Sequence, residues 1–240
     1  MDTVDVVKNV FHRNLTLRAG VNASAFYSSL RKTQDSIQER NVEAVFAMFN
    51  DTEFFRSVSN EEKSIIYRYK NDGKTRILDR FDLENWIYEE PTEIPEWTIT
   101  DSIETVNGYD CILAKTDFRG RHWTAWFTPE IPVNEGPWKL WGLPGLILKA
   151  QDSKKHYTYE AKSVILNPGG YVEYFDYLPD RLKTERKKAL QEKRKALQKS
   201  IRDQLIATGV LKIDPLKGDR PKGVDELRNY DFEETDYLHE

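Results

Sequence analysis

Short runs of alternating apolar and polar residues extend along much of the chain, and this period of two is typical of half-buried β-strands. One such run begins at Ser64, turns at Asn71–Gly73 (NDG), whose residues readily adopt the positive φ angles of a hairpin, and returns over Arg76–Asp79. A third strand is expected over Asp82–Tyr88, and one or two earlier strands over Val4–Leu17. The pattern therefore predicts a protein rich in antiparallel β-sheet.

The best-defined hairpin is expected over Tyr109–Thr128, with its turn at Arg119–Gly120. This turn places Phe118 opposite Arg121 and sorts the two strands into two faces. The mainly apolar face, expected in the core, carries Ile112, Ala114, Phe118, Trp123, Ala125 and Phe127. The mixed face, expected toward solvent or a cavity, carries Cys111, Leu113, Lys115, Asp117, His122, Thr124 and Trp126.

The segment Pro129–Pro144 predicts a loop of about sixteen residues, and loops of this length in compact domains are commonly functional. Its end reads WGLPGLILKA, where Gly142 and Gly145 permit backbone conformations closed to other residues and Pro144 fixes φ. We expect this stretch to turn the chain sharply into a buried strand at Leu146–Leu148, and a further hairpin to follow across DSKK.

Helical spacing of apolar residues occurs in two places. Residues Asp35–Asn50 carry apolar side chains at steps of three and four, which predicts an amphipathic helix. Residues Pro179–Leu205 repeat leucine and alanine at helical spacing, with ten Lys or Arg and two Glu between Arg181 and Arg202. We therefore expect a long basic helix, followed from Asp225 by a strongly acidic tail that packs on it or projects.

Composition excludes some classes of protein. The formal net charge is −4, with 36 Lys and Arg against 40 Asp and Glu, so the chain lacks the basic excess of a nucleic-acid-binding protein. A single cysteine excludes an internal disulfide and a cysteine-rich zinc site. No apolar run approaches the ~20 residues of a transmembrane helix, and the first residues do not resemble a signal peptide.

Motifs with a defined catalytic mechanism, such as GxGxxG, GxxxxGK[ST], HExxH and GxSxG, do not occur in the sequence. The one constellation suited to acid–base, thiol or metal chemistry is His122 opposite Asp117, with Cys111 on the same face. The alternative is a plain surface pair of His122 and Asp117, which we favour. We expect no cofactor, no metal and no enzymatic activity.

Two groups of residues could bind a ligand or partner. Trp138 and Trp141 in the long loop could stack on a ligand, but we favour the alternative that they fill the core at one end of the sheet. The basic helix could contact anionic lipid or an acidic partner, or its charge could be neutralised by the chain's own acidic tail. The tentative binding residues are Trp138, Trp141, Leu143, Pro144, Arg181, Lys187 and Arg194.

The stretch GLPGLI at Gly142–Ile147 resembles the GLPGLI family, secreted or envelope proteins of Bacteroidota whose function is not established. The resemblance extends to NASAFYSS at Asn22–Ser29, to Trp97 and Ile99, to the whole of Gly108–Leu148 and to NYDFEE near the C-terminus. It implies a protein of the periplasm or outer membrane, exported with a signal peptide that this chain lacks. It also implies a sheet curved around a helix, similar to periplasmic lipoprotein carriers, with Gly142, Pro144 and Gly145 as structural residues.

We therefore expect an α+β protein with a strongly curved, mostly antiparallel sheet, like a half-barrel. Residues 1–178 would form the β domain with the helix at 35–50, and residues 179–240 the basic helix with its tail. The predicted function is non-enzymatic binding of a protein partner in the cell envelope, such as an outer-membrane complex, with peripheral membrane contact through the basic helix. The alternative is a carrier that holds an acyl chain or lipid in the curved sheet, and an enzyme using His122 and Asp117 is a third hypothesis.

Overall fold

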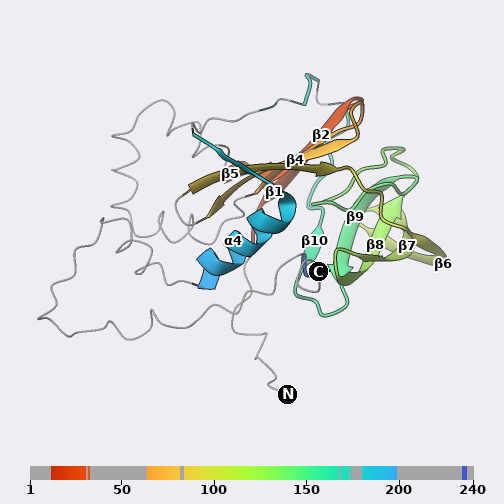
Figure 1. Ribbon diagram of the computed structural model, residues 1–240. Helices are drawn as coiled ribbons and strands as arrows, with labels where there is room; N and C mark the ends of the chain where they lie inside the picture. Colours follow the sequence, from red (N-terminus) through yellow and green to blue (C-terminus); the bar gives the residue numbers. More distant parts are fainter. Residues whose placement is uncertain are drawn as a thin grey trace, which may run out of the picture.

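The computed structural model describes residues 12–30, 32, 64–81, 84–167, 169–172, 174, 180–198 and 234–236. Within these ranges the chain forms two β-sheets that lie side by side, with helix α4 (Arg186–Gln198) against the first of them (Figure 1). The helix expected at 35–50 lies outside the described residues.

The first sheet has six strands in the order β1-β2-β3-β4-β5-β11. Their bounds are Leu15–Ala19 (β1), Ala23–Ser28 (β2), Ile65–Tyr69 (β3), Lys74–Phe81 (β4), Glu84–Pro91 (β5) and Leu182–Thr184 (β11). Neighbouring strands are antiparallel except β11, which pairs with β5 in parallel. The meander expected from Ser64 onward is confirmed as β3, β4 and β5. Of the strands expected over Val4–Leu17, residues 4–11 lie outside the described residues, and β1 includes Leu15–Leu17.

The second sheet has five antiparallel strands in the order β10-β9-β8-β7-β6. Their bounds are Thr98–Val106 (β6), Tyr109–Phe118 (β7), Arg121–Thr128 (β8), Leu146–Asp152 (β9) and Thr158–Glu160 (β10). The predicted hairpin of β7 and β8 is confirmed in its register, because Phe118 pairs with Arg121. Its turn residues Arg119 and Gly120 have φ angles of 53° and 78°, the left-handed geometry of a tight hairpin turn.

One face of this hairpin differs from the expectation. Cys111 and Trp126, predicted on a face open to solvent or a cavity, are buried in a cluster with Val106 and Leu148. Ala161 and Val164, which follow β10, pack against this cluster. The alternation therefore predicted correctly which residues share a face. The outer face is partly buried because the chain after β10 returns to cover it.

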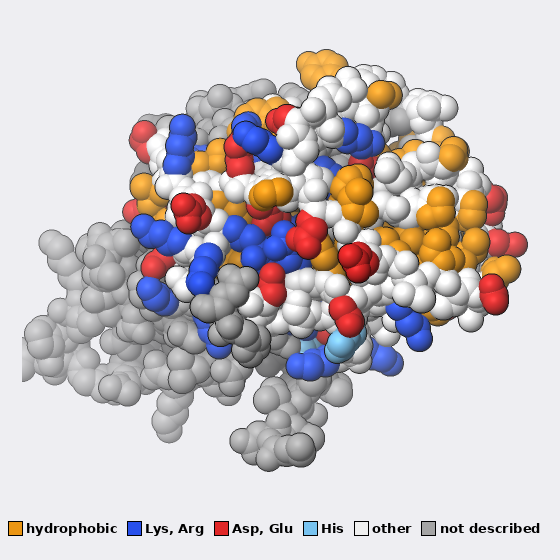
Figure 2. All heavy atoms as spheres, turned by 45° about the vertical axis from the view of Figure 1, so that its right-hand side comes forward, with side chains coloured by type: hydrophobic (Ala, Val, Ile, Leu, Met, Phe, Trp, Pro, Cys, Tyr) orange, Lys and Arg blue, Asp and Glu red, His pale blue; other side chains and the backbone are white. Residues whose placement is uncertain are grey.

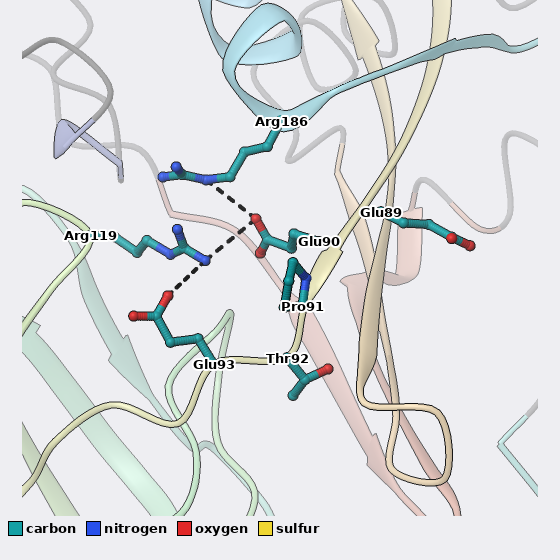
Figure 3. A pocket seen from close by; sticks show the side chains of 7 residues that line it. All are labelled: Glu89, Glu90, Pro91, Thr92, Glu93, Arg119 and Arg186. Carbon is teal, nitrogen blue, oxygen red and sulfur yellow. Dashed lines mark ion pairs between the residues drawn. The ribbon is translucent and has the colours of Figure 1, made fainter. Parts of the chain in front are cut away.

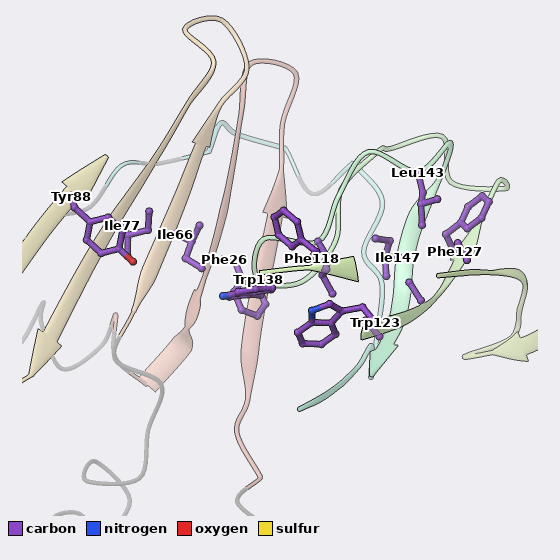
Figure 4. Close-up of a cluster of buried hydrophobic side chains, with 14 of the residues drawn as sticks. Phe26, Ile66, Ile77, Tyr88, Phe118, Trp123, Phe127, Trp138, Leu143 and Ile147 are labelled. Atoms are coloured by element: carbon purple, nitrogen blue, oxygen red, sulfur yellow. The ribbon is translucent and has the colours of Figure 1, made fainter. Parts of the chain in front are cut away.

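The main core lies between the two sheets (Figure 4). The first sheet contributes Phe26, Ile66, Ile77 and Tyr88, and the second contributes Ala114, Phe118, Trp123, Ala125, Phe127, Ile147 and Ala150. The loop Pro129–Pro144 adds Trp138, Leu140 and Leu143, and Trp138 packs on Trp123 with ring centroids 5.4 Å apart. These aromatic side chains bury large apolar areas, so they account for much of the force that holds the two sheets together.

The expectation of a mostly antiparallel β protein is confirmed, and the one helix of eight or more residues in the described ranges is α4, but the single strongly curved sheet is not what the structure contains. The chain forms two sheets, because strand β5 ends at Pro91 and the segment through Pro95 carries the chain to β6 in the other sheet. Proline lacks the N–H that a further ladder hydrogen bond requires. The comparison with a half-barrel carrier is not supported by this arrangement.

The basic helix also begins later than expected. Residues Leu182–Thr184, included in the predicted helix, form strand β11, and α4 starts at Arg186. The helix buries Ala189, Leu190 and Ala196, and Lys193 Nζ reaches Asp79 of β4 at 2.7 Å. Burial acts to raise the pKa of Asp79, but Lys193 outweighs it and lowers that pKa. Within the described ranges, no helix is long and apolar enough to span a bilayer.

Two glycines shape the end of the long loop. Gly142 has a φ of 92°, a region that glycine occupies without steric cost. Gly145 lies so close to the chain that a Cβ added to it would sit 2.2 Å from the carbonyl oxygen of Thr128. Ile147 N–H then donates to Glu135 O at 2.9 Å, which ties strand β9 to its own loop. The predicted role of the stretch, a sharp entry into a buried strand, is confirmed.

Candidate functional site

A group of charged side chains, most of them buried or half-buried, gathers where the two sheets, the long loop and the start of α4 meet. We call it the charged cleft, formed by Arg68, Glu90, Glu93, Arg119, Glu135, Lys139, Arg186, Glu234 and Asp236. Figure 2 shows positive and negative side chains gathered near the middle of one face of the molecule. Burial of so many charges requires that each be paired.

Glu90 stands at the centre of the charged cleft (Figure 3). Strand β5 places it on the same face as buried Tyr88, so its side chain is carried inward. Its Oε1 lies 2.6 Å from Lys139 Nζ, and its Oε2 lies 3.3 Å from Arg186 Nε and 3.5 Å from Arg119 Nη2. The carboxylate of Glu90 therefore forms ion pairs with cations from the long loop, the β7–β8 turn and α4.

The C-terminal residues Glu234, Thr235 and Asp236 lie in the charged cleft. Glu234 pairs with Lys139 at 2.7 Å and with Arg186 at 2.6 Å, and its side chain is only 5% exposed. Asp236 accepts from Arg186 Nη2 at 2.5 Å and lies 3.6 Å from Arg119 Nη1. Part of the acidic tail thus lies back on Arg186, at the start of the basic helix.

The backbone of the C-terminal segment is also held. Thr235 N–H donates to Arg119 O at 3.0 Å, and Thr235 Oγ1 donates to Gly120 O at 3.0 Å. A Cβ on Gly120 would lie 2.3 Å from Thr235 Oγ1 and 2.7 Å from Asp236 N. The missing side chain of Gly120 is therefore what allows the segment to lie directly on the β7–β8 turn.

The ion pairs change the pKa values of the groups involved. Burial alone would raise the pKa of Glu234, but Lys139, Arg186 and Arg119 outweigh it and lower that pKa from 4.5 to about 2. Burial acts to lower the pKa of Arg186, but Glu234 and Asp236 outweigh it and raise that pKa above its usual value. Both groups are therefore held in their charged forms.

A second part of the charged cleft lies beside strand β3. Arg68 forms an ion pair with Glu135, which is fully buried, and Lys70 Nζ lies 3.1 Å from the same carboxylate. The guanidinium of Arg68 also stacks over the ring of Trp141 at 4.8 Å. Desolvation by burial is the largest influence on Arg68 and lowers its pKa, although Glu135 acts in the opposite direction.

An open pocket of about 500 Å³ adjoins the charged cleft. It is lined by Glu89, Glu90, Pro91, Thr92, Glu93, Arg119 and Arg186. Arg119 Nη2 lies 3.1 Å from Glu93, whose side chain is mostly exposed at the edge. The lining is rich in charge, so this pocket suits a polar or ionic ligand better than an acyl chain.

The predicted binding residues of the long loop lie in different environments in the structure. Trp138 and Leu143 are buried in the core, which agrees with the alternative that the tryptophans fill it. Trp141 is half-buried and lines the charged cleft, and its indole N–H donates to Glu93 O at 2.8 Å. Pro144 is exposed. The side chain of Trp141 lines the cleft, and Trp138 contacts it through its backbone, because its carbonyl oxygen accepts from Arg68 Nη2 at 3.4 Å.

The predicted basic residues lie elsewhere. Arg181 precedes β11, whereas Lys187 and Arg194 lie on α4, and Lys187 is exposed. The residue of α4 that lines the pocket is Arg186. Sequence reasoning missed it, along with Glu90, Arg119, Lys139 and Glu234. The sequence did contain a sign that two of these charged residues are buried. Glu90 follows Tyr88 by two positions and therefore shares its inward face. Lys139 stands between two apolar residues.

His122 and Asp117 pair across the β7–β8 hairpin, as the register predicted. Their side chains are 76% and 78% exposed, whereas Cys111 is fully buried. The three residues are therefore not brought together, and the geometry favours the interpretation of a surface pair. In the ranges that the structure describes, no group of three or more His, Cys, Asp or Glu is arranged to hold a metal ion.

The fold and the site define a two-sheet β protein with a charged cleft that its own acidic segment fills. Residues 115–149 match the model of a family described as "Protein of unknown function (Porph_ging)". This match begins in β7 and ends in β9, and it includes the long loop with Gly142–Ile147. No curated protein matches the chain.

Solved structures add a likeness in fold. A structure described as "Structure of PNGF-II in P21 space group" has a TM-score of 0.51 and 14% sequence identity, and the match covers 78% of this chain and 31% of that chain. A structure of PNGF-II in a C2 space group has a TM-score of 0.47 and 15% identity, covering 73% and 28%. This chain spans about a third of the length of those proteins. At such low identity the likeness concerns the fold alone.

Proposed function

We propose that this chain is a non-enzymatic protein of a bacterial cell envelope that binds a protein partner, and that the charged cleft is its binding site. The observation that carries the proposal is the way Arg119, Lys139 and Arg186 hold Glu234–Asp236. They hold this segment by its two carboxylates, and the carbonyl oxygen of Arg119 also accepts a hydrogen bond from its main chain, which is a way in which proteins recognise a segment of a partner.

The envelope location is the part of the proposal that comes from resemblance. The stretch Gly142–Ile147 reads GLPGLI, and it lies inside the segment that matches a family of unknown function. We take the chain to be a member of the GLPGLI group, exported to the periplasm or associated with the outer membrane. Glycines at 142 and 145 serve the loop that carries Glu135, Lys139 and Trp141 into the charged cleft.

The basic helix has a narrower role in this proposal than its charge alone suggested. Helix α4 is fixed to the first sheet by buried Ala189 and Leu190 and by the pair of Lys193 and Asp79. This anchoring sets the position of Arg186, the first residue of the helix, in the charged cleft. Partner binding would then involve the start of the helix, and its exposed basic residues would serve for peripheral membrane contact.

The carrier hypothesis receives less support. The space between the two sheets is occupied by Trp123, Trp138 and Phe118, whose rings pack against one another. The open pocket of about 500 Å³ is lined mainly by charged and polar residues. A bound acyl chain would need an apolar cavity instead.

The test compares two substitutions that remove the same charge from adjacent residues. Arg186→Gln alters the charged cleft, and Lys187→Gln alters an exposed neighbour on α4. Native mass spectrometry of each full chain, gently extracted from its own cell envelope, should show a second polypeptide with the wild type and with Lys187→Gln, and none with Arg186→Gln. Circular dichroism would confirm that the variants are folded. A wild-type chain without a second polypeptide, or full retention by Arg186→Gln, would contradict the proposal.

A further inference from the structure

We infer that the charged cleft recognises an acidic segment with two carboxylates one residue apart, and that Glu234–Asp236 is the chain's own copy of such a segment. A partner would bind by replacing it with a similar segment of its own. This inference rests on the proposed function, since it names the chemistry of the partner and the way in which access to the site is controlled.

The spacing of the two carboxylates matches the arrangement of the cations. Glu234 and Asp236 are separated by one residue, and both of their carboxylates reach the same guanidinium. Arg186 contacts both of them, with 2.6 Å to Glu234 and 2.5 Å to Asp236. The planar guanidinium suits this double contact, and a lysine at that position would not reproduce it.

Charge balance indicates that the cleft needs an anionic occupant. Arg119, Lys139 and Arg186 are largely buried, and the main body of the protein supplies Glu90 and Glu93 as their partners. Among the described residues, these three cations would face only two carboxylates if the C-terminal segment were absent. A buried cation without a partner is costly, so an acidic segment is favoured there and a neutral one is not.

The middle residue of the segment, Thr235, is recognised by hydrogen bonds from its backbone N–H and from its hydroxyl group. Thr235 N–H donates to Arg119 O, and Thr235 Oγ1 donates to Gly120 O, both at 3.0 Å. The first contact is available to almost any residue, and the second requires a hydroxyl side chain. The site therefore favours the pattern Glu-Thr-Asp or Glu-Ser-Asp.

The same geometry leaves room for a longer ligand. The open pocket of about 500 Å³ lies beside Arg119 and Arg186, the two residues that also hold Asp236. Asp236 is 29% exposed, so the segment is less enclosed at this end than at Glu234. A partner segment could begin at the pocket and progressively replace the chain's own residues.

Because the segment belongs to the same chain, it competes with any partner as an intramolecular ligand, and this competition does not weaken on dilution. The full chain should therefore bind an added acidic peptide weakly, and weakening its own segment should increase that binding. Competition of this kind makes the C-terminal segment a control element for the site.

The experiment uses a fluorescein-labelled synthetic peptide with the sequence of residues 229–238, NYDFEETDYL, and measures its binding by fluorescence anisotropy. Three full-length proteins are compared: the wild type, Glu234→Gln with Asp236→Asn, and that double variant with Arg186→Gln added. The double variant should bind the peptide at least about tenfold more tightly than the wild type, and Arg186→Gln should abolish this gain. Adding Lys187→Gln in place of Arg186→Gln should leave it unchanged.

Equal binding by the wild type and the double variant would overturn the inference, as would a gain that persists with Arg186→Gln. If the double variant does not fold, Asp236→Asn alone removes the more exposed carboxylate and should give a smaller gain in the same direction. A peptide carrying the same two amide substitutions should not bind.

The outcomes separate this inference from the proposed function. Peptide binding that depends on Arg186, in a protein that carries no partner in its envelope, would support the recognition of an acidic segment and contradict the proposed function. A partner lost on Arg186→Gln, together with no peptide binding by the double variant, would support the proposed function and overturn the assignment of an acidic Glu-x-Asp segment.

Discussion

Lys139 and Glu234 are 95 positions apart in the sequence, yet the ammonium of one lies 2.7 Å from the carboxylate of the other. Both side chains are only 5% exposed, and Lys139 also lies 2.6 Å from Glu90. The lysine is carried inward because its neighbours Trp138 and Leu140 are buried in the core. The pair therefore links the long loop, strand β5 and the C-terminal segment through one cation.

Replacing Lys139 with methionine should destabilise the protein strongly. The substitution keeps most of the side-chain volume but removes the cation shared by Glu90 and Glu234. Breaking a buried ion pair from one side costs about 3–5 kcal/mol in free energy of unfolding. The measurement is urea unfolding followed by circular dichroism.

The matched control is Lys195→Met on α4, which breaks an exposed pair with Glu192. Exposed helical pairs of this kind contribute about 0.3–0.5 kcal/mol. Similar losses for Lys139→Met and Lys195→Met would show that the charged cleft contributes no more than a surface pair, and would refute the prediction.

The β7–β8 hairpin could be predicted to the residue because its signals are local. Arg119 and Gly120 adopt the positive φ angles that a two-residue turn requires, and the turn alone sets which residues face one another. The division into two sheets could not be predicted in this way. Alternation shows which face of a strand is apolar, but the strands of one curved sheet and of two packed sheets have the same alternation.

The charged cleft was harder to predict than the hairpin for a related reason. Its cations come from Arg68, Arg119, Lys139 and Arg186, and these residues are brought together only by the tertiary fold. Since 32% of the residues are charged, a lysine or arginine in the sequence is rarely informative by itself. A charged residue that lies two positions along a strand from a buried apolar residue, as Glu90 does from Tyr88, is the local sign that the charge is buried.

Stability should depend on pH through Glu234. The cations of the cleft lower its pKa from 4.5 to about 2, so the folded state binds this proton less readily than the unfolded chain does. The stabilisation is therefore complete at pH values above about 5.5 and is lost as the pH falls through 4.5 toward 2.

The measurement compares the free energy of unfolding of the wild type with that of Glu234→Gln at several pH values. The wild type should be more stable at neutral pH, and its advantage should shrink between about pH 5 and pH 3, because glutamine does not titrate there. Glu192→Gln, which alters an exposed pair, should show little difference from the wild type across the range. An advantage that stays constant down to about pH 3 would contradict the assignment.

The glycine at 145 should tolerate substitution less well than a glycine in an open turn. An alanine Cβ there would lie 2.2 Å from Thr128 O, 2.7 Å from Thr128 C and 3.0 Å from Pro129 N. All three atoms belong to the backbone where β8 ends, so relief of the clash requires the start of β9 to move. The core contacts of Ile147 and the hydrogen bond from Ile147 N–H to Glu135 O would move with it.

We expect Gly145→Ala to lower the free energy of unfolding by about 3 kcal/mol or more, because overpacking against a fixed backbone is among the costly kinds of substitution. Gly73 provides the comparison, since its φ is 63° and no atom lies within 4 Å of an added Cβ. Gly73→Ala should cost about 1 kcal/mol, through backbone conformation alone. Urea unfolding of the two variants tests the difference, and equal losses would mean that close approach to β8 is not the reason for a glycine at 145.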